Sequence, residues 1–462
     1  MPNIFRNLPS VNQLLESPQL KQMVDNVSHN VVVDGVRSFL DELRQQVSEA
    51  AEEATIPTPN ELASRIAEWI KNEEQPYLRP VINATGIILH TGLGRAPLAQ
   101  RAVEEVVQIS AGYASVEVDL KTGERGQRIK AVEKLICTLT GAEAAVVVNN
   151  NAAATMLTLS AVAGGREVIV SRGQLIEIGG SYRLPDVMEC SGSILREVGT
   201  TNKTHLADYQ RAISEETGAL LRVHPSNFEV VGFTKSVSTR ELVELARKHN
   251  LPVIDDVGSG ALIDFAQFGL HDEPIVQESI EDGADVVLFS GDKLIGGPQC
   301  GIIVGSRKWI DKILANPLMR AMRVDKMTLA ALAETLRLYR DPEKAKLEVP
   351  ILRMLSMPVE NLKLRADKIA TLIGASPAIS HCEVIEDQSM LGGGSLPTQN
   401  IRTWCVGLTP SEGSANRLAD RLRQASTPIL GRVQRDQLLL DLRTIQPDQD
   451  ALIATVFDEL AE

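Results

Sequence analysis

The sequence predicts an α/β fold in which a mainly parallel sheet forms a large central domain. Short runs of β-branched residues alternate with helical stretches from about residue 76 to 340. A helix-type spacing of apolar residues fills the segment 1–75, and a new, mixed pattern follows Arg340-Asp341-Pro342. Alternating strands and helices favour a parallel sheet covered by helices on both faces. We therefore expect a helical domain at 1–75, the sheet domain at 76–340 and a smaller α+β domain at 341–462.

The N-terminal segment 1–75 is expected to be helical because its apolar residues recur three or four positions apart. Pro57-Thr58-Pro59-Asn60 interrupts this pattern, and Thr58 or Asn60 is a candidate cap for the helix that follows. A polar stretch, 72–80, is expected to link this domain to the next. The apolar positions are Val11, Leu14 and Leu15, then Val36, Phe39, Leu40 and Leu43, then Leu62, Ile66 and Ile70.

Seven runs in the central domain are expected to form the strands of one seven-stranded sheet. Helical patterns such as 128–140 and 239–248 lie between these runs. The last domain is expected to combine helices with shorter strands, at 400–406 and 437–440. The seven central runs are 144–148, 167–170, 194–198, 219–223, 252–254, 285–289 and 301–304.

The composition is typical of a globular protein and leads us to expect a cytoplasmic one. Hydrophobic residues make up 44% of the 462 residues, and the net charge of -13 argues against nonspecific binding to polyanions such as DNA. The five cysteines form no CxxC pair, so we expect neither a disulfide framework nor a metal site. The N-terminus lacks a signal pattern, and no apolar run is long enough for a membrane span.

Lys293 is the first candidate for chemistry. It follows a predicted strand that ends at Ser290 and precedes Gly296-Gly297-Pro298. Open α/β sheets bind ligands at the carboxyl ends of their strands. Burial there would favour the neutral amine, which can attack an aldehyde to form an imine. Spacing alone leaves a solvated loop lysine as the alternative.

An acidic pair, Asp255-Asp256, follows the apolar strand that begins near Val253. A pyridinium nitrogen needs an anionic partner to stay protonated, and a carboxylate at a strand end can supply one. A helix cap or a turn aspartate is the alternative. The pattern does not decide which of the two aspartates takes either role.

Three asparagines form the third candidate element, because Asn149-Asn150-Asn151 follow a strand and precede the alanine-rich start of a helix. Helix N-terminal N–H groups bind phosphate, and small residues such as Ala152 let the backbone approach. A plain polar turn with a cap is the alternative. The three elements occur in the order phosphate turn, aspartate, lysine, which resembles the large domain of aspartate-aminotransferase-type (fold-type I) pyridoxal-phosphate enzymes.

Longer segments resemble one family of this fold, the bacterial selenocysteine synthases, or L-seryl-tRNA(Sec) selenium transferases. The resemblance covers nearly the whole chain, including the helical N-terminal domain. It implies an enzyme that converts seryl-tRNA(Sec) to selenocysteinyl-tRNA(Sec) through an aminoacrylyl-tRNA intermediate, with selenophosphate as selenium donor. The segments are Leu8-Pro9-Ser10-Val11, Ile82-Asn83-Ala84-Thr85-Gly86, His90-Thr91-Gly92-Leu93-Gly94-Arg95, Ser171-Arg172-Gly173-Gln174, Ile178-Gly179-Gly180-Ser181-Tyr182-Arg183, Val223-His224-Pro225-Ser226-Asn227-Phe228 and Ser290-Gly291-Asp292-Lys293.

The resemblance also implies roles by position. Lys293 would carry pyridoxal 5'-phosphate as an imine, with Asp292 beside it in the catalytic site, and Asp256 would face the pyridine nitrogen, with Asp255 as the open alternative. Asn227 would bind the cofactor's 3-hydroxyl. The phosphate would be held by Asn150, Asn151, Ala152 and Ser290.

Three arginines, Arg95, Arg320 and Arg323, would bind selenophosphate. Arg320 and Arg323 are three positions apart, so they share a face if the segment is helical, and arginine forks bind oxyanions well. Without the resemblance, a surface ion pair with an acid such as Asp325 is the alternative.

The partners that the resemblance implies are seryl-tRNA(Sec), bound by the N-terminal domain, and further copies of the chain in a decamer built as a ring of dimers. The segment 1–75 holds six Lys and Arg against twelve Asp and Glu, so its composition does not itself indicate tRNA binding. Two other functions remain as alternatives. One is a β-eliminating lyase that acts on a free amino acid, and the other is a non-catalytic tRNA-binding or scaffolding protein.

Overall fold

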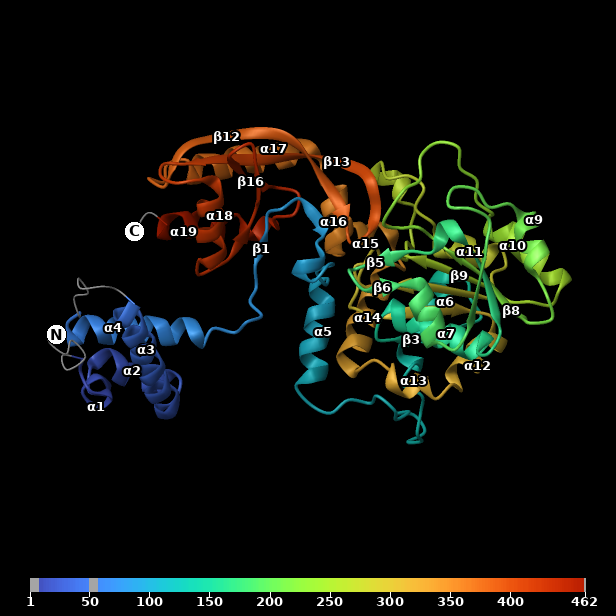
Figure 1. Ribbon diagram of the computed structural model, residues 1–462, viewed down its shortest axis with the longest axis horizontal. Coiled ribbons are helices and arrows are strands. Elements are labelled where there is room, and N and C mark those ends of the chain that lie inside the picture. Colours follow the sequence, from blue (N-terminus) through green and yellow to red (C-terminus); the bar gives the residue numbers. More distant parts are fainter. Residues whose placement is uncertain (1–7, 50–56, 461–462) are drawn as a thin grey trace. The chain divides into compact units, whose positions relative to one another are not determined.

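The computed structural model describes residues 8–49 and 57–460, which divide into two compact units, 1–80 and 81–462 (Figure 1). The boundary between the units falls at the end of the predicted linker. The further division of the second unit at residue 340 stays a prediction.

The first unit is helical, as predicted. Thr58 begins its last helix with a capping box, in which its side chain accepts from the Glu61 N–H and the Glu61 side chain accepts from the Thr58 N–H. Its core is aliphatic, and Phe39 and Trp69 add an edge-to-face pair with ring centroids 6.2 Å apart. The helices are α1 (Val11–Leu15), α2 (Pro18–Asn26), α3 (His29–Glu49) and α4 (Pro59–Glu73).

A seven-stranded sheet forms the centre of the second unit, and all seven predicted strands belong to it. Only β11 runs antiparallel to its neighbours, β3 and β10, so the other six strands run in one direction. This sheet confirms the predicted fold class. In sheet order the strands are β3 (Ala144–Val148), β11 (Gly301–Gly305), β10 (Val286–Ser290), β9 (Val253–Gly258), β8 (Thr217–Val223), β4 (Glu167–Ser171) and β7 (Ile194–Val198).

Helices cover both faces of this sheet. Alternate residues of β3 enter two different cores, since Ala145 and Val147 pack with α6 and α14 while Ala144, Val146 and Val148 pack with α7, α8 and α12. The helices are α5 (Gln100–Ser110), α6 (Lys130–Thr140), α7 (Asn151–Ala163), α8 (Leu184–Cys190), α9 (Leu206–Ala212), α10 (Thr239–Lys248), α11 (Val276–Glu281), α12 (Arg307–Leu314), α13 (Leu318–Ala321) and α14 (Lys326–Leu338).

A second sheet, of five strands, is built mainly from the C-terminal part of the chain, and its long hairpin is drawn in orange and red in Figure 1. The short strand predicted at 437–440 is confirmed as Gln437–Asp441, but the expectation of a short strand at 400–406 was wrong, because that run lies inside a strand of 16 residues. That strand pairs along its length with a preceding strand that was not predicted. In sheet order the strands are β15 (Arg432–Gln434), β16 (Gln437–Asp441), β13 (Ser395–Pro410), β12 (Ile379–Gly392) and β2 (Ile87–Leu89).

Residues just after the first unit therefore join the C-terminal strands. Two short pairs, β1 with β14 and β5 with β6, complete the strands, and C-terminal helices pack on the second sheet. Among the described helices, none is long and apolar enough to cross a membrane. The remaining elements are β1 (Ile82–Asn83), β5 (Glu177–Ile178), β6 (Tyr182–Arg183), β14 (Ile429–Leu430), α15 (Pro342–Glu348), α16 (Pro350–Ser356), α17 (Val359–Ile373), α18 (Ala415–Gln424) and α19 (Asp450–Glu459).

Candidate active site

The carboxyl ends of the parallel strands place most of the predicted residues at one edge of the main sheet. The strand β3 ends before Asn149, β9 carries Asp256, and β10 ends at Ser290, just before Lys293. Because β3, β9 and β10 run in the same direction, these three ends meet at the same edge. This is the edge at which open α/β sheets bind ligands.

Lys293 is buried, with 7% of its surface exposed, which excludes the solvated loop lysine. Its loop is fixed by hydrogen bonds, since the Leu294 N–H donates to the Ser259 carbonyl at 3.2 Å and the Tyr339 hydroxyl donates to the Ile295 carbonyl at 2.9 Å. Burial lowers the pKa of the Lys293 amine, and the Arg95 cation lowers it further. The site therefore favours a neutral amine, although nearby carboxylates oppose this shift.

Asp256 and Asp255 point to opposite faces of β9, as successive residues of a strand do. Asp256 accepts hydrogen bonds from Asn151 Nδ2 at 2.9 Å, Thr155 Oγ1 at 3.0 Å and its own turn at Gly258. Burial raises the pKa of the Asp256 carboxyl, while these donors and the charge of Lys293 oppose the rise. Asp256 thus lies on the side of β9 that faces the lysine.

Asp255 is fully buried on the other side of the strand. It accepts from Arg222 Nη1 at 2.8 Å, from Thr239 Oγ1 at 2.9 Å and from Ser279 Oγ at 2.8 Å. Three donors thus occupy this carboxylate in a structural network. Between the two aspartates left open by the sequence, the geometry favours Asp256 as the partner of a ligand bound near Lys293.

The helix α7 begins at this edge, as predicted. The Asn150 side chain caps it by accepting from the Ala153 N–H at 2.8 Å, and the Asn150 carbonyl accepts from the Ala154 N–H. Among the described contacts, the N–H groups of Asn151 and Ala152 have no acceptor, so both are available to an anion. A phosphate held here would be bound by these backbone groups, because the Asn150 side chain caps α7 and the Asn151 side-chain nitrogen donates to Asp256.

Asp292 and Arg95 form an ion pair with Nη1 and Oδ2 2.6 Å apart. Asp292 is 5% exposed and Arg95 lies in a turn with φ of 63°, a conformation that is unfavourable for a side-chain-bearing residue. The Arg95 N–H donates to the His90 carbonyl at 3.0 Å, which helps to hold this turn. The arginine is therefore brought beside the residue that precedes Lys293.

Arg320 and Arg323 line a cavity of about 440 Å³ together with Arg125, Arg128 and Glu117. The ion pair with Asp325 that the sequence left open is not seen, because Asp325 caps α14. Arg323 instead approaches Glu117, with Nη1 and Oε1 3.9 Å apart. Arg95 is not among the residues that line this cavity, and it pairs instead with Asp292.

Asn227 and Ser290 complete the predicted set. Asn227 Nδ2 donates to the Glu177 carbonyl at 2.8 Å, and its buried Oδ1 has no partner among the described residues. Ser290, at the end of β10, is 6% exposed, and its side chain forms no hydrogen bond with the described part of the chain. Both side chains thus have polar atoms free for a ligand.

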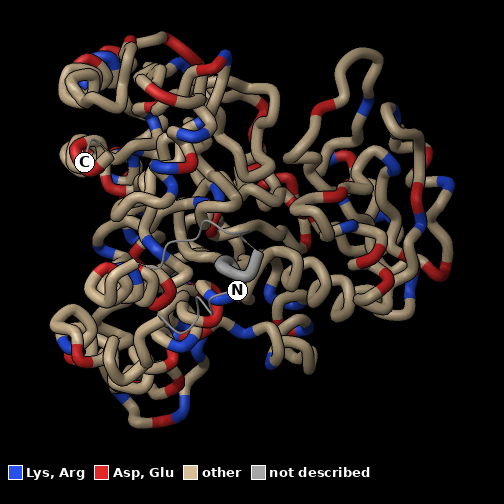
Figure 2. The backbone as a smooth tube through the Cα atoms, turned by 60° about the vertical axis from the view of Figure 1, so that its left-hand side comes forward, with Lys and Arg blue, Asp and Glu red and all other residues tan. Residues whose placement is uncertain are grey.

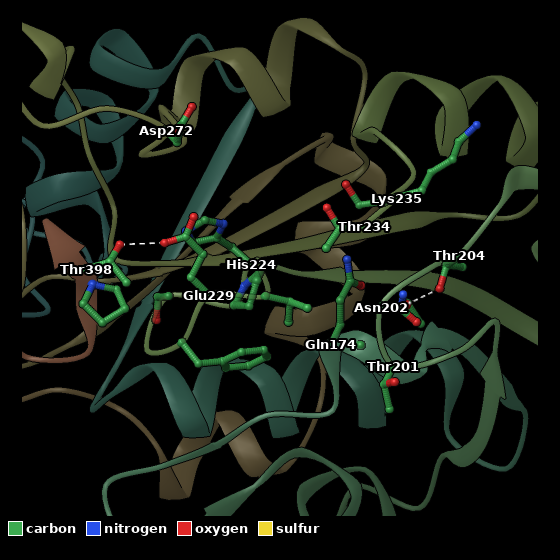
Figure 3. Close-up of a pocket in the computed structure, with 18 of the residues that line it drawn as sticks. Gln174, Thr201, Asn202, Thr204, His224, Glu229, Thr234, Lys235, Asp272 and Thr398 are labelled. Carbon is green, nitrogen blue, oxygen red and sulfur yellow. Dashed lines mark hydrogen bonds between the residues drawn. The ribbon is translucent and has the colours of Figure 1, made fainter. Parts of the chain in front are cut away.

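A second cavity, of about 580 Å³, lies among the loops after β4, β7 and β8, and residues on both sides of Asn227 line it (Figure 3). His224 lines it, and burial and the Arg222 cation lower the pKa of this imidazole to about 4. Glu229 accepts from Thr398 Oγ1 at 2.6 Å across the cavity, as the dashed line in Figure 3 shows. His224 is thus a neutral side chain at neutral pH.

Sequence reasoning missed three residues near the lysine and Asp256: Thr155, Tyr182 and Glu273. Thr155 lies four positions after Asn151 on α7, a spacing that places both on the face that meets Asp256. Burial and the Asp256 charge raise the pKa of Tyr182. No signal in the sequence marks Glu273.

Comparison with known proteins gives one consistent family. The family model described as L-seryl-tRNA selenium transferase matches residues 81–446, and the model described as selenocysteine synthase N terminal matches residues 5–44. Relatives named L-seryl-tRNA(Sec) selenium transferase include one from Maridesulfovibrio salexigens, 49% identical over 100% of both chains, and one from Geobacter sulfurreducens, 46% identical over 99% of both. The solved structure of D-glucosaminate-6-phosphate ammonia-lyase matches with a TM-score of 0.55 and 20% identity, covering 83% of this chain and 96% of that one, which indicates a shared fold.

Proposed function

The chain belongs to the L-seryl-tRNA selenium transferase family, and from that premise we propose how its residues serve the conversion of seryl-tRNA(Sec) to selenocysteinyl-tRNA(Sec) for selenoprotein synthesis. The family relationship makes the protein an enzyme, so the scaffolding alternative is set aside. The observation that carries the proposal is the burial of Lys293 at the sheet edge where Asp256 and the start of α7 also lie.

The residues at this edge fit pyridoxal 5'-phosphate, the cofactor that the family and fold imply. Lys293 offers an amine for the aldehyde carbon, and Asp256 offers a carboxylate for the ring nitrogen. The free N–H groups of Asn151 and Ala152 suit the phosphate, with the Ser290 hydroxyl close by in the sheet. The unpartnered Oδ1 of Asn227 suits the 3-hydroxyl group, which can donate to it.

When bound, pyridoxal phosphate withdraws electrons from the seryl Cα, so that its proton and then the β-hydroxyl group can leave. Asp256 would hold a proton on the ring nitrogen, and Asn151 and Thr155 would fix the carboxylate in position. The Lys293 amine, kept near neutral by burial, would take the Cα proton on Nζ. Asp292 would orient Arg95 toward the substrate side of the lysine.

Selenophosphate is the proposed selenium donor, with Arg95, Arg320 and Arg323 as its binding residues. The cavity beside Arg320 and Arg323 contains two further arginines and one glutamate, an excess of positive charge that suits an oxyanion. Because Arg95 does not line this cavity, we propose that copies of the chain complete the site, in a dimer-based homo-oligomer such as a decamer.

Replacement of the lysine tests the proposed function. Lys293→Ala is expected to abolish the visible absorption band of the lysine-bound cofactor and the dehydration of seryl-tRNA(Sec). Lys248→Ala removes an exposed lysine at the end of α10 and is the matched control. This variant should keep both the absorption band and the dehydration of seryl-tRNA(Sec). A borohydride-reducible band that persists in Lys293→Ala contradicts the assignment. Activity on free serine rather than seryl-tRNA in the parent enzyme would instead support the lyase alternative.

A further inference from the structure

Three carboxyl groups lie close enough to Lys293 to raise the pKa of its amine: Asp256, Asp292 and Glu273. Two of them are already engaged. Asp256 accepts hydrogen bonds through both carboxylate oxygens, and Asp292 is paired with Arg95. Glu273 remains as the third, and neither the predicted site nor the proposed reaction uses it.

Glu273 is 9% exposed, and its two oxygens differ. Oε1 accepts from the hydroxyl of Ser259, whereas Oε2 is buried and has no hydrogen-bond partner among the described residues. Ser259 is itself fully buried, and its carbonyl accepts from the Leu294 N–H, next to the lysine. One serine therefore contacts both Glu273 and the loop that carries Lys293.

The turn that carries Glu273 is held in place from both sides. The Gln399 side chain accepts from the His271 N–H and donates to the His271 carbonyl, both at 2.7 Å. After the turn, the Val276 N–H donates to the Ala261 carbonyl at 3.1 Å. The backbone around Glu273 is thus fixed, and its side chain is held by the hydrogen bond from Ser259, with the second oxygen buried and unpartnered among the described residues.

We propose that Glu273 acts on Lys293 through its charge, setting the pH range in which the lysine is a neutral amine able to bind the cofactor. This inference rests on the proposed function, because it requires Lys293 to be the cofactor lysine. Glu273 and Lys293 form no direct ion pair, so the charge of Glu273 acts on the lysine amine at longer range. Glu273 is therefore a positioning residue that need not touch the substrate.

The direction of the effect follows from the charges. Burial raises the pKa of Glu273 to about 7, while Ser259 and Lys293 oppose the rise. Below that pH the neutral carboxyl group no longer favours the ammonium form of Lys293, so burial and Arg95, which favour the neutral amine, are opposed only by Asp256 and Asp292. Above it the carboxylate favours the ammonium form. Two such coupled groups titrate over a broader pH range than one group alone.

The test measures how readily the amine of the cofactor-free protein reacts. Pyridoxal phosphate is added across a pH series and trapped with borohydride, and the modified Lys293 peptide is quantified by mass spectrometry. Glu273→Gln, which has the same shape without the charge, is expected to shift the midpoint of trapping down by about one pH unit and to narrow the transition. The visible band of the loaded protein should lose its protonated form at a lower pH as well.

Two further variants make the comparison specific. Ser259→Ala leaves the carboxyl group in place but removes its hydroxyl donor, so it should shift the midpoint in the same direction by less. Glu278→Gln removes an exposed glutamate on the nearby α11 and should give the parent profile. Trapping profiles of Glu273→Gln and parent that superimpose would overturn the inference. If Glu273→Gln does not fold, a Ser259→Ala profile identical to the parent overturns it.

The two proposals fail in different ways. If the parent protein is trapped at a lysine other than Lys293, the proposed function fails. If Lys293 is trapped in every folded variant with one common pH profile, only the role of Glu273 fails. If Lys293 is the trapped residue and its trapping midpoint shifts in Glu273→Gln but not in Glu278→Gln, both proposals are supported.

Discussion

Asp255 and Asp256 are neighbours on β9, but their surroundings predict opposite consequences of the same substitution. Asp255→Asn is expected to lower the free energy of unfolding of the cofactor-free protein by roughly 3 kcal/mol, because it leaves a mostly buried Arg222 without its charge partner. Asp256→Asn should change it by less than about 1 kcal/mol. The new side chain can keep its oxygen where Asn151 and Gly258 donate, while its amide nitrogen donates to the Thr155 hydroxyl, which in turn donates to the Asn151 carbonyl. Urea denaturation measures both values.

For cofactor affinity we expect the opposite order, with the larger effect from Asp256→Asn. Asp256→Asn removes a charged hydrogen-bond partner of the ring nitrogen, worth about 1.5–3 kcal/mol, so affinity for pyridoxal phosphate should fall roughly 10- to 100-fold. Asp255→Asn, where it folds, should bind nearly as well as the parent. Equal losses of affinity in an absorbance titration would argue against a special role for Asp256.

The residue types and order were enough to predict most of the site, while the contacts between side chains were not. Lys293, Asp256 and the start of α7 follow strand ends, and strand ends can be located from apolar runs. Glu273 lies in an irregular turn after a short 3-10 helix, and its approach to Ser259 depends on how that turn folds back. No spacing rule connects the two positions, so the sequence alone could not indicate the pair.

At the scale of elements, β11 and the start of α7 pack without room for a side chain between them. A Cβ atom on Gly301 would lie 2.2 Å from the Asn150 carbonyl oxygen and 2.9 Å from the Asn151 nitrogen, both backbone atoms. Gly301→Ala is therefore expected to displace the phosphate turn. It should cost about 1–3 kcal/mol of stability and weaken cofactor binding about tenfold.

Gly112→Ala is the matched control, because a Cβ atom there meets nothing within 4 Å. Isothermal titration with pyridoxal phosphate and thermal unfolding of the cofactor-free proteins measure the two effects. If Gly301→Ala binds the cofactor as tightly as Gly112→Ala does, the turn does not hold the phosphate.

The sequence predicted the strands of the main sheet better than those of the second sheet. Most strands of the main sheet are buried on both faces, so they stand out as apolar runs, and all seven strands were located, including the largely exposed edge strand β7. In contrast, β12 has exposed polar residues such as His381 and Glu383 along much of its length. Its pairing with β13 depends on the turn at Gly393 and Gly394, both with positive φ, and an apolar pattern does not report such a turn.

At the scale of the whole molecule, charge offers little guidance to the tRNA partner. Positive and negative residues are interspersed along both units (Figure 2), and the segment 1–75 carries six Lys and Arg against twelve Asp and Glu. Binding that depends on few phosphate contacts has a shallow dependence on salt concentration. Recognition by the first unit would therefore depend on shape and on contacts repeated across copies of the chain.

Removal of the first unit tests whether that unit binds the tRNA while the second unit binds the cofactor. The unit has its own core, and both sheets and every proposed cofactor contact lie in 81–462. A chain that starts at Val81 is therefore expected to fold and to form the lysine-bound cofactor band, but to bind seryl-tRNA(Sec) at least about tenfold more weakly, a loss of about 1.4 kcal/mol. Filter binding at several salt concentrations measures this, with size-exclusion chromatography to compare oligomeric state. Unchanged tRNA affinity in an assembly of the parent size would assign tRNA binding to the second unit.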